Sequence, residues 1–295
     1  MKIQRVNRGR NHWYVDQDAS GERVPGVTTI TGGGLPKPAL INWAGEATAE
    51  YAVDNWDTLA AMGPAARLKA IKAGRYASRD EAANRGTQVH KLGERLLLGE
   101  QVTVPPLLEG YVRSYVQFLD DFDVDPVHVE AVVYSETHRH VGTLDLIADL
   151  RFPDMPEYDD LERSADGYVR SLIDVKTSRT GIFGDVAVQL APYRYSEFLI
   201  ARDPESGDEQ VIDMPEVAFT GAVHVTPHGY ELRPVLAGPD QYRDFLYIKE
   251  VARFVDTSRD LVGEPVIPPT TARFELTRID LDPAAEVGEL TEAAF

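Results

Sequence analysis

Two acidic residues and a lysine stand out as groups that could do chemistry on a charged substrate. Asp145 lies in the apolar run Leu144–Ala148, and Asp174 and Lys176 flank Val175 in the run Ile-Asp-Val-Lys-Thr. Because side chains alternate along a strand, Asp174 and Lys176 should lie on one side of a sheet and Val175 on the other. A carboxylate inside a strand is unfavourable unless a counter-charge compensates it, and a divalent cation does so. The pattern therefore predicts a Mg²⁺ site with oxygen ligands.

A simple ion pair is the alternative explanation for Asp174 and Lys176 taken alone. Further residues favour a site, and in chain order these are Gly86, His90, Gly142, Gln189 and Tyr193. Gln189 and Tyr193 are four residues apart and share one face of a helix. A small residue such as Gly142 allows a close approach of the backbone. A histidine beside carboxylates also makes Mn²⁺ a suitable ion.

Four motifs follow one another along the chain: G-x-x-x-H, G-x-x-D, D-x-K-T and Q-x-x-x-Y. Each is unspecific alone, but together and in this order they resemble the motif series of the RecB-like nucleases in the PD-(D/E)XK superfamily. They span residues 86–193, just over a third of the chain. Residues 27–30 and 38–44 are also similar to N-terminal regions of phage-encoded stand-alone members. The resemblance implies an α/β (α+β), restriction-endonuclease-like core with a central mixed sheet. Its element order would be helix, strand, strand, strand, helix, strand, after a helical N-terminal elaboration.

The resemblance also implies which residues would hold the metal. His90, Asp145 and Asp174 would be ligands, and the backbone carbonyl of Val175 would complete the set of ligands that the protein supplies. The implied cofactor is Mg²⁺ or Mn²⁺. Glu130, on the preceding predicted strand, would contact a second metal or the substrate, or would simply be an exposed strand residue.

The remaining motif residues would act on the substrate. Lys176 would hold or activate the attacking water and offset charge in the transition state, while Gln189 and Tyr193 would orient Lys176 or contact the DNA backbone. The implied activity is metal-dependent hydrolysis of DNA phosphodiester bonds, by an exonuclease in recombination, replication or DNA end processing. A structure-specific endonuclease, an RNase of the same fold and a nucleic-acid-binding protein without activity are the alternatives. The intact motif set speaks against the last of these.

Composition excludes several other chemistries. The chain has no cysteine, so it can form no disulfide, no thiolate zinc site and none of the iron–sulfur clusters that many relatives carry. It has no G-x-x-x-x-G-K-[S/T] motif, so we expect no nucleotide cofactor and no helicase motor. The chain would then be either a free-standing nuclease or a subunit serving a separate motor. DNA is the expected partner, and a separate helicase, a recombinase or a single-strand-binding protein is a candidate second partner. The apolar runs are short, so we expect no membrane span and a cytoplasmic location, in the bacterial host if the chain is phage-encoded.

The net charge of −18 opposes binding to nucleic acid, but the charge is unevenly distributed. The segment 67–95 has eight basic residues and three acids, a balance of +5, which leaves −23 for the rest of the chain. This segment surrounds His90, so we predict that it contacts DNA phosphates. The predicted contacts are Arg75, Arg79, Arg85 and Lys91. The alternative is a solvated helix face whose arginines pair with nearby acids.

The elements that position these residues can be predicted from periodicity and from turn and cap residues. The predicted helices cover 38–62, 64–73, 78–98 (capped by Ser78), 107–120, 185–201 and 241–255. The helix over 107–120 is amphipathic, with one apolar stripe formed by Leu108, Tyr111, Tyr115, Phe118 and Leu119. The predicted strands cover 13–15, 27–31, 129–134, 141–150, 168–175, 217–225 and 230–236. We predict three regions: an N-terminal elaboration (1–75), a nuclease core (76–260) and an acidic tail (261–295).

Overall fold

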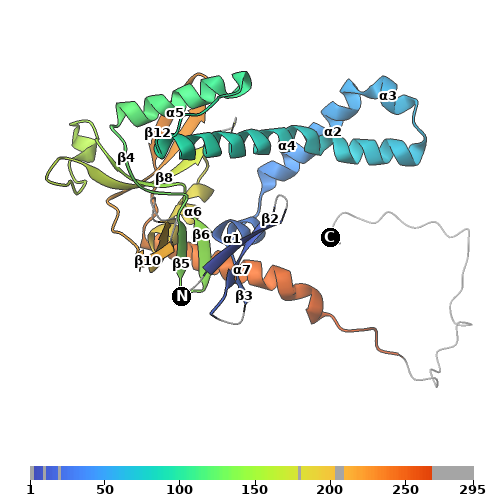
Figure 1. Ribbon diagram of the computed structural model, residues 1–295. Helices are drawn as coiled ribbons and strands as arrows, with labels where there is room; N and C mark the ends of the chain where they lie inside the picture. Colours follow the sequence, from blue (N-terminus) through green and yellow to red (C-terminus); the bar gives the residue numbers. More distant parts are fainter. Residues whose placement is uncertain (1–2, 9–10, 19–20, 179–180, 203–208, 268–295) are drawn as a thin grey trace, which may run out of the picture. The chain divides into compact units, whose positions relative to one another are not determined.

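The computed structural model describes residues 3–8, 11–18, 21–178, 181–202 and 209–267. Contacts divide the chain into two units, residues 1–257 and 258–295. The first unit is a mixed α/β structure in which helices flank sheets of parallel and antiparallel strands (Figure 1). The second unit begins with a short 3₁₀ turn, η3 (Ser258–Leu261). The predicted acidic tail lies outside the described residues from residue 268 onward.

Two of the sheets carry the candidate site. One has the strand order β10-β9-β5-β6 and the other the order β12-β11-β8-β7-β4. Their strands are β4 (Asp125–Val129), β5 (Val132–Ser135), β6 (His140–Thr143), β7 (Leu146–Leu150), β8 (Val169–Lys176), β9 (Phe198–Arg202), β10 (Glu209–Asp213), β11 (Phe219–Thr226) and β12 (Gly229–Pro234). Strand β11 is parallel to β8, whereas β7 is antiparallel to β8, so the five-stranded sheet is mixed.

A bend carries the chain from one sheet to the other at two matching places. Strand β4 passes into β5 through Glu130 and Ala131, and β6 passes into β7 through Leu144 and Asp145. The two bends bind each other, since the Glu130 amide donates to the Asp145 carbonyl (3.0 Å) and the Leu144 amide donates to the Ala131 carbonyl (2.9 Å). Glu130 has φ 50°, which is uncommon for a residue other than glycine. The expectation that Asp145 lies within an unbroken strand is wrong, because the apolar run continues across this bend into a different sheet.

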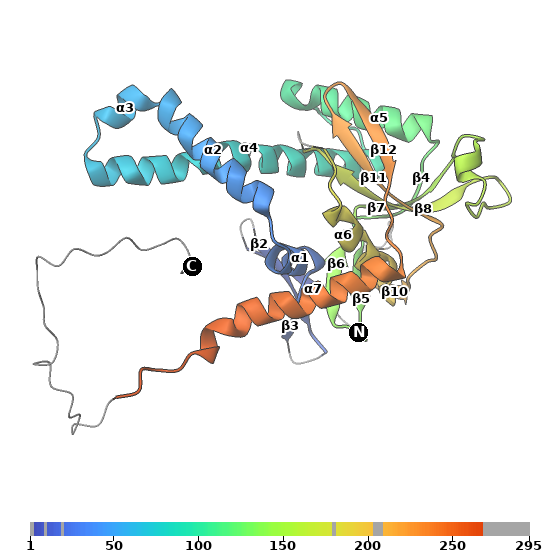
Figure 2. The same cartoon turned by 180° about the vertical axis from the view of Figure 1, so that it is seen from behind.

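Helices cover the sheets on both faces. Helices α4 (Pro64–Leu97) and α5 (Glu109–Asp121) lie on one face, and helices α1 (Val27–Gly34), α6 (Asp185–Arg194) and α7 (Pro239–Thr257) lie on the other (Figures 1 and 2). The other helical segments are α2 (Pro38–Asp54), α3 (Trp56–Ala60), η1 (Pro106–Leu108) and η2 (Pro156–Tyr158). None of the helices in the described part of the chain is long and apolar enough to cross a membrane.

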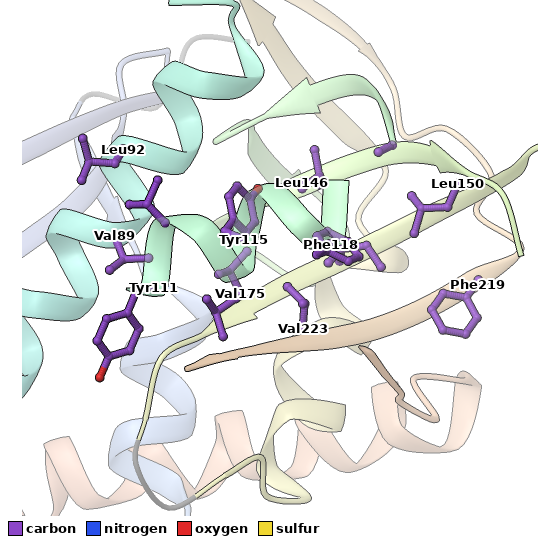
Figure 3. Packing of buried hydrophobic residues seen from close by; sticks show 14 of the residues in the cluster. Val89, Leu92, Tyr111, Tyr115, Phe118, Leu146, Leu150, Val175, Phe219 and Val223 are labelled. Carbon is purple, nitrogen blue, oxygen red and sulfur yellow. The ribbon is translucent and has the colours of Figure 1, made fainter. Parts of the chain in front are cut away.

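The core between α5 and the sheet is built from the apolar stripe predicted for that helix. Tyr115 and Phe118 of α5 pack against Leu146, Val175 and Val223, as Figure 3 shows. Phe118 is fully buried. Burial of such side chains is the main favourable term in folding, at about 25 cal/mol per Å² of apolar surface. This core fixes the strands that carry the candidate site.

Residues 27–31 were predicted to form a strand, and that prediction is wrong. They begin α1, where Val27 and Ile30 are spaced three apart and buried against the α6–α7 side. Gly34 explains why the helix can pack closely on α7, because a Cβ there would lie 2.4 Å from the Ile248 carbonyl oxygen. Tertiary packing has overridden the strand preference of the β-branched residues.

Two further predicted elements are corrected. Helix α4 is continuous from Pro64, so Ser78 does not begin a helix and the expected region boundary at residue 75 falls inside α4. The helix predicted over 185–201 ends at Arg194, and residues 198–202 form β9 instead. That segment is a strand because it pairs with β5 on one side and β10 on the other. Such pairing cannot be read from local periodicity.

An additional small sheet packs beside β6. It has the order β1-β2-β3, formed by β1 (Ile3–Arg8), β2 (Asn11–Asp16) and β3 (Glu22–Val24). Its buried residues Ile3, Tyr14 and Val24 share a core cluster with Val141 of β6. The Val141 amide also donates a hydrogen bond to a backbone carbonyl just after β3, that of Pro25 (3.2 Å).

Candidate metal centre

Three side chains from separate elements meet at the two bends. His90 comes from α4, Glu130 from the bend after β4, and Asp145 from the bend after β6. The His90 Nδ1 lies 3.7 Å from Asp145 Oδ1 and 4.0 Å from Glu130 Oε1. One possible ligand atom from each residue lies within 4.8 Å of the others. These residues line a cavity of about 10 Å³, about the space that one water molecule needs.

Local structure orients these three groups. Val89 and Leu92 of α4 are buried in the core, which leaves His90 between them facing the bends. Asp145 uses its second oxygen, Oδ2, to accept a hydrogen bond from the Val175 amide (2.7 Å), so the carboxylate is tied to β8. Oδ1 remains directed at His90. Packing and a backbone hydrogen bond therefore hold two of the three possible ligands in place.

Glu130 occupies a strained and half-buried position. Its φ of 50° is maintained by the hydrogen bonds between the bends, and such strain is concentrated at functional sites. Burial, and secondarily the Asp145 carboxylate, raises the pKa of Glu130 to about 7, while His90 opposes the increase. Glu130 therefore does not behave as an exposed strand residue. A cation between these carboxylates would offset the repulsion from Asp145 that adds to the raised pKa of Glu130.

Asp174 and Lys176 form a second cluster on the α6 side of β8. Asp174 is only 2% exposed, and its Oδ1 accepts a hydrogen bond from Gln189 (2.9 Å). Its Oδ2 lies 2.6 Å from the Lys176 Nζ, so this oxygen is paired with the ammonium. The ammonium of Lys176 in turn donates to Gln189 Oε1 (3.2 Å). The structure thus brings Asp174, Lys176 and Gln189 together.

The protonation of this second cluster follows from burial and charge. Burial raises the pKa of Asp174 to about 6, and the ammonium of Lys176 opposes that increase. Burial lowers the pKa of Lys176, but the carboxylates of Asp174 and Asp145 more than compensate and raise it. Lys176 is therefore charged. It can provide positive charge and hydrogen bonds, but it is not a base at neutral pH.

The ligand set differs from the one expected from sequence. His90 and Asp145 do come together, but their third neighbour is Glu130, whereas Asp174 is held by Lys176 and Gln189. The donor set of one imidazole and two carboxylates suits Mg²⁺ or Mn²⁺. The close, partly buried carboxylates of Glu130 and Asp145 also fit a cation between them.

The glycines of the motifs are explained by close contacts. A Cβ at Gly86 would lie 3.1 Å from the Thr177 Oγ1, so the first and third motifs touch. A Cβ at Gly142 would lie 2.3 Å from a ring carbon of Tyr193, so the second and fourth motifs touch. Tyr193 is buried, and this burial, with the nearby carboxylates, raises its pKa well above the usual value. Tyr193 thus packs within the site and is not available at the surface for DNA.

Glu94 is a site residue that the sequence analysis did not predict. It lies one helical turn after His90 and lines the same cavity. Its charge contributes to the raised pKa of Glu130. The spacing of four residues from His90 is a signal that could have identified it.

The basic segment of α4 is divided between structural and exposed residues. Arg67 donates to the carbonyls of Leu59, Ala60 and Met62, and Arg95 pairs with Glu100. Arg85 is 8% exposed, with its guanidinium 5.7 Å from the Tyr111 ring centre. The prediction that Arg85 contacts DNA is therefore wrong, since its charge is inside the protein. Lys91 is exposed, and the side chains of Arg75 and Arg79 lie outside the described residues.

Comparison with known proteins adds no assignment to this geometry. No protein-family model matches the chain, and no curated protein matches its sequence with significance. The function is therefore argued from the residues of the site.

Proposed function

We propose that this protein is a metal-dependent nuclease that hydrolyses DNA phosphodiester bonds, with a restriction-endonuclease-like core of the RecB-like type. One observation carries the proposal: four motifs spread over residues 86–193 lie against one another at a single site. A surface ion pair between Asp174 and Lys176 would not require Gly86 beside Thr177, nor a second carboxylate cluster next to it. A hydrolytic centre accounts for all of these features.

Within this proposal His90, Glu130 and Asp145 hold the metal ion. Bound there, Mg²⁺ or Mn²⁺ would supply a water of lowered pKa and positive charge for the non-bridging phosphate oxygens. Asp145 would keep its geometry through the Val175 amide, which fixes one oxygen and leaves the other for the metal. Asp174 would add a further carboxylate to the site, next to the ammonium of Lys176.

Lys176 and Gln189 would position the reacting water and phosphate. Lys176 is charged, so its Nζ would stabilise negative charge developing on the phosphate and would not remove a proton. Gln189 bonds to both Asp174 and Lys176 and would keep the ammonium at a fixed distance from the carboxylate. Tyr193 would act indirectly, by filling the space left by Gly142.

The test uses the purified chain with end-labelled linear DNA, circular DNA and RNA, with and without Mg²⁺ or Mn²⁺. We expect metal-dependent cleavage of linear DNA, while cleavage of circular DNA or of RNA would identify an endonuclease or an RNase instead. Asp174→Ala and Asp145→Asn should each abolish cleavage. Glu250→Gln, an exposed carboxylate paired with Arg253 on α7, is the matched control and should cleave normally. A wild-type chain without metal-dependent cleavage of any nucleic acid, or an active Asp174→Ala variant, would refute the proposal.

A further inference from the structure

Arg5 lies on the inner face of the N-terminal sheet. In the strand register Arg5 is opposite Tyr14, and Tyr14 is opposite Val24. Residues opposite one another point to the same face, and Tyr14 and Val24 are both buried on the side toward β6. Arg5 points to that side but is itself exposed. The sheet therefore presents a guanidinium at the edge of the buried interface.

Arg5 is adjacent to the candidate metal centre. Its Nη1 lies 3.5 Å from the Thr143 Oγ1, which is also 2.7 Å from the Tyr14 hydroxyl. Thr143 is the last residue of β6, two residues before Asp145. Arg5 is also near enough to Glu130 for their charges to interact. The hairpin thus brings a cation from the start of the chain to a cluster formed between residues 90 and 145.

A further cation would add to the positive charge of the metal and of Lys176 in holding an anionic substrate. Glu94, Glu130, Asp145 and Asp174 surround the site, and the nearby charge of Lys176 is engaged by Asp174 and Gln189. Within the part of the chain that the structure describes, the side chain of Arg5 makes one hydrogen bond, a long one to a neutral hydroxyl. Its other N–H groups form the planar fork that matches two phosphate oxygens.

From this placement we propose that Arg5 is a substrate-binding residue that holds a DNA phosphate at the metal centre. The inference rests on the proposed function and deepens it, because it assigns a phosphate contact to the N-terminal hairpin. Positive charge positioned beside the scissile phosphate stabilises the additional negative charge of the transition state. Thr143 and Tyr14 would hold the guanidinium in place before substrate arrives.

The experiment compares Arg5→Ala and Arg5→Lys with Arg23→Ala. Arg23 is a matched control on the same small sheet: it is opposite Val15, so it points to the other face, and it lies 4.8 Å over the Trp13 ring. Cleavage of linear DNA is measured in Mn²⁺. Binding of a short duplex is measured in Ca²⁺ over a series of salt concentrations, and thermal unfolding checks that each variant is folded. If Arg5→Ala is unfolded, Arg5→Gln replaces it.

We expect Arg5→Ala to cleave about 100-fold more slowly, as after loss of a transition-state hydrogen-bond donor, with Arg5→Lys intermediate. In Ca²⁺ the slope of log affinity against log salt concentration should decrease by about the amount expected for one phosphate contact. Arg23→Ala should match wild type in both assays. If folded Arg5→Ala stays within about twofold of wild type in both the cleavage rate and the salt dependence of binding, the inference is overturned. Failure of wild type to cleave would refute the proposed function instead, because the Ca²⁺ binding assay still measures the Arg5 contact. Absence of wild-type binding in that assay would overturn the inference as well.

Discussion

His140 should make the stability of this protein sensitive to acid. It is fully buried in β6, where its Nε2 lies 3.1 Å from the Tyr242 hydroxyl and its ring meets Phe245 edge-on at 5.1 Å. Its Nδ1 has no hydrogen-bond partner within the described residues. Burial lowers the pKa of His140 to about 3; the Glu197 carboxylate opposes this decrease, and the charges of His138 and Lys249 add to it.

The sign of the effect follows from the direction of this change. In the unfolded chain His140 takes up a proton near pH 6.5, whereas in the folded protein it remains neutral down to about pH 3. Its contribution to stability is therefore fully present above pH 6.5 and is lost as the pH falls. Each tenfold difference in proton affinity corresponds to about 1.4 kcal/mol, so His140 should lower the free energy of unfolding by about 3 kcal/mol between about pH 7 and about pH 4.5.

The assay is urea unfolding of wild type and His140→Gln at several pH values. Glutamine keeps a neutral hydrogen-bonding group but cannot take up the proton, and all other titrating groups are common to both proteins. The difference in unfolding free energy between them should therefore shrink by about 3 kcal/mol on acidification over this range. His228→Gln, at an exposed turn position, is the control for the substitution itself. A wild-type to His140→Gln difference that stays constant with pH would refute the reasoning.

Three further predictions concern the site and its surroundings. Mn²⁺ at about 100 times its Kd should stabilise wild type by about 3 kcal/mol in thermal unfolding, and Asp145→Asn should abolish this effect; equal stabilisation of both would exclude Asp145 as a ligand. Gly142→Ala should destabilise the protein by about 1–3 kcal/mol, because the new Cβ would meet the Tyr193 ring; an unchanged midpoint in urea would contradict the packing. Lys91→Glu should weaken duplex binding and flatten its salt dependence, whereas Arg85→Ala should lower Tm and leave that dependence unchanged. An unchanged Tm with a flattened salt dependence in Arg85→Ala would show instead that Arg85 contacts DNA.

Sequence by itself determined the features that depend on neighbouring residues in the chain. Alternation along a strand places Asp174 and Lys176 on one face of β8, and helical spacing places Gln189 and Tyr193 on one face of α6. The structure then shows that Gln189 meets Asp174 and Lys176. The apolar stripe of α5 predicted the side that packs on the sheet. These features follow from backbone geometry, which a local pattern encodes.

Tertiary structure alone decided which residues became partners. Glu130 joins His90 and Asp145 because two bends, paired through backbone hydrogen bonds, lie opposite one another, and no local pattern encodes that register. Arg85 belongs to a basic run by composition, yet it is buried because α5 covers its side of α4. A charge acquires its role from the groups that surround it in space, and those groups are distant in the chain.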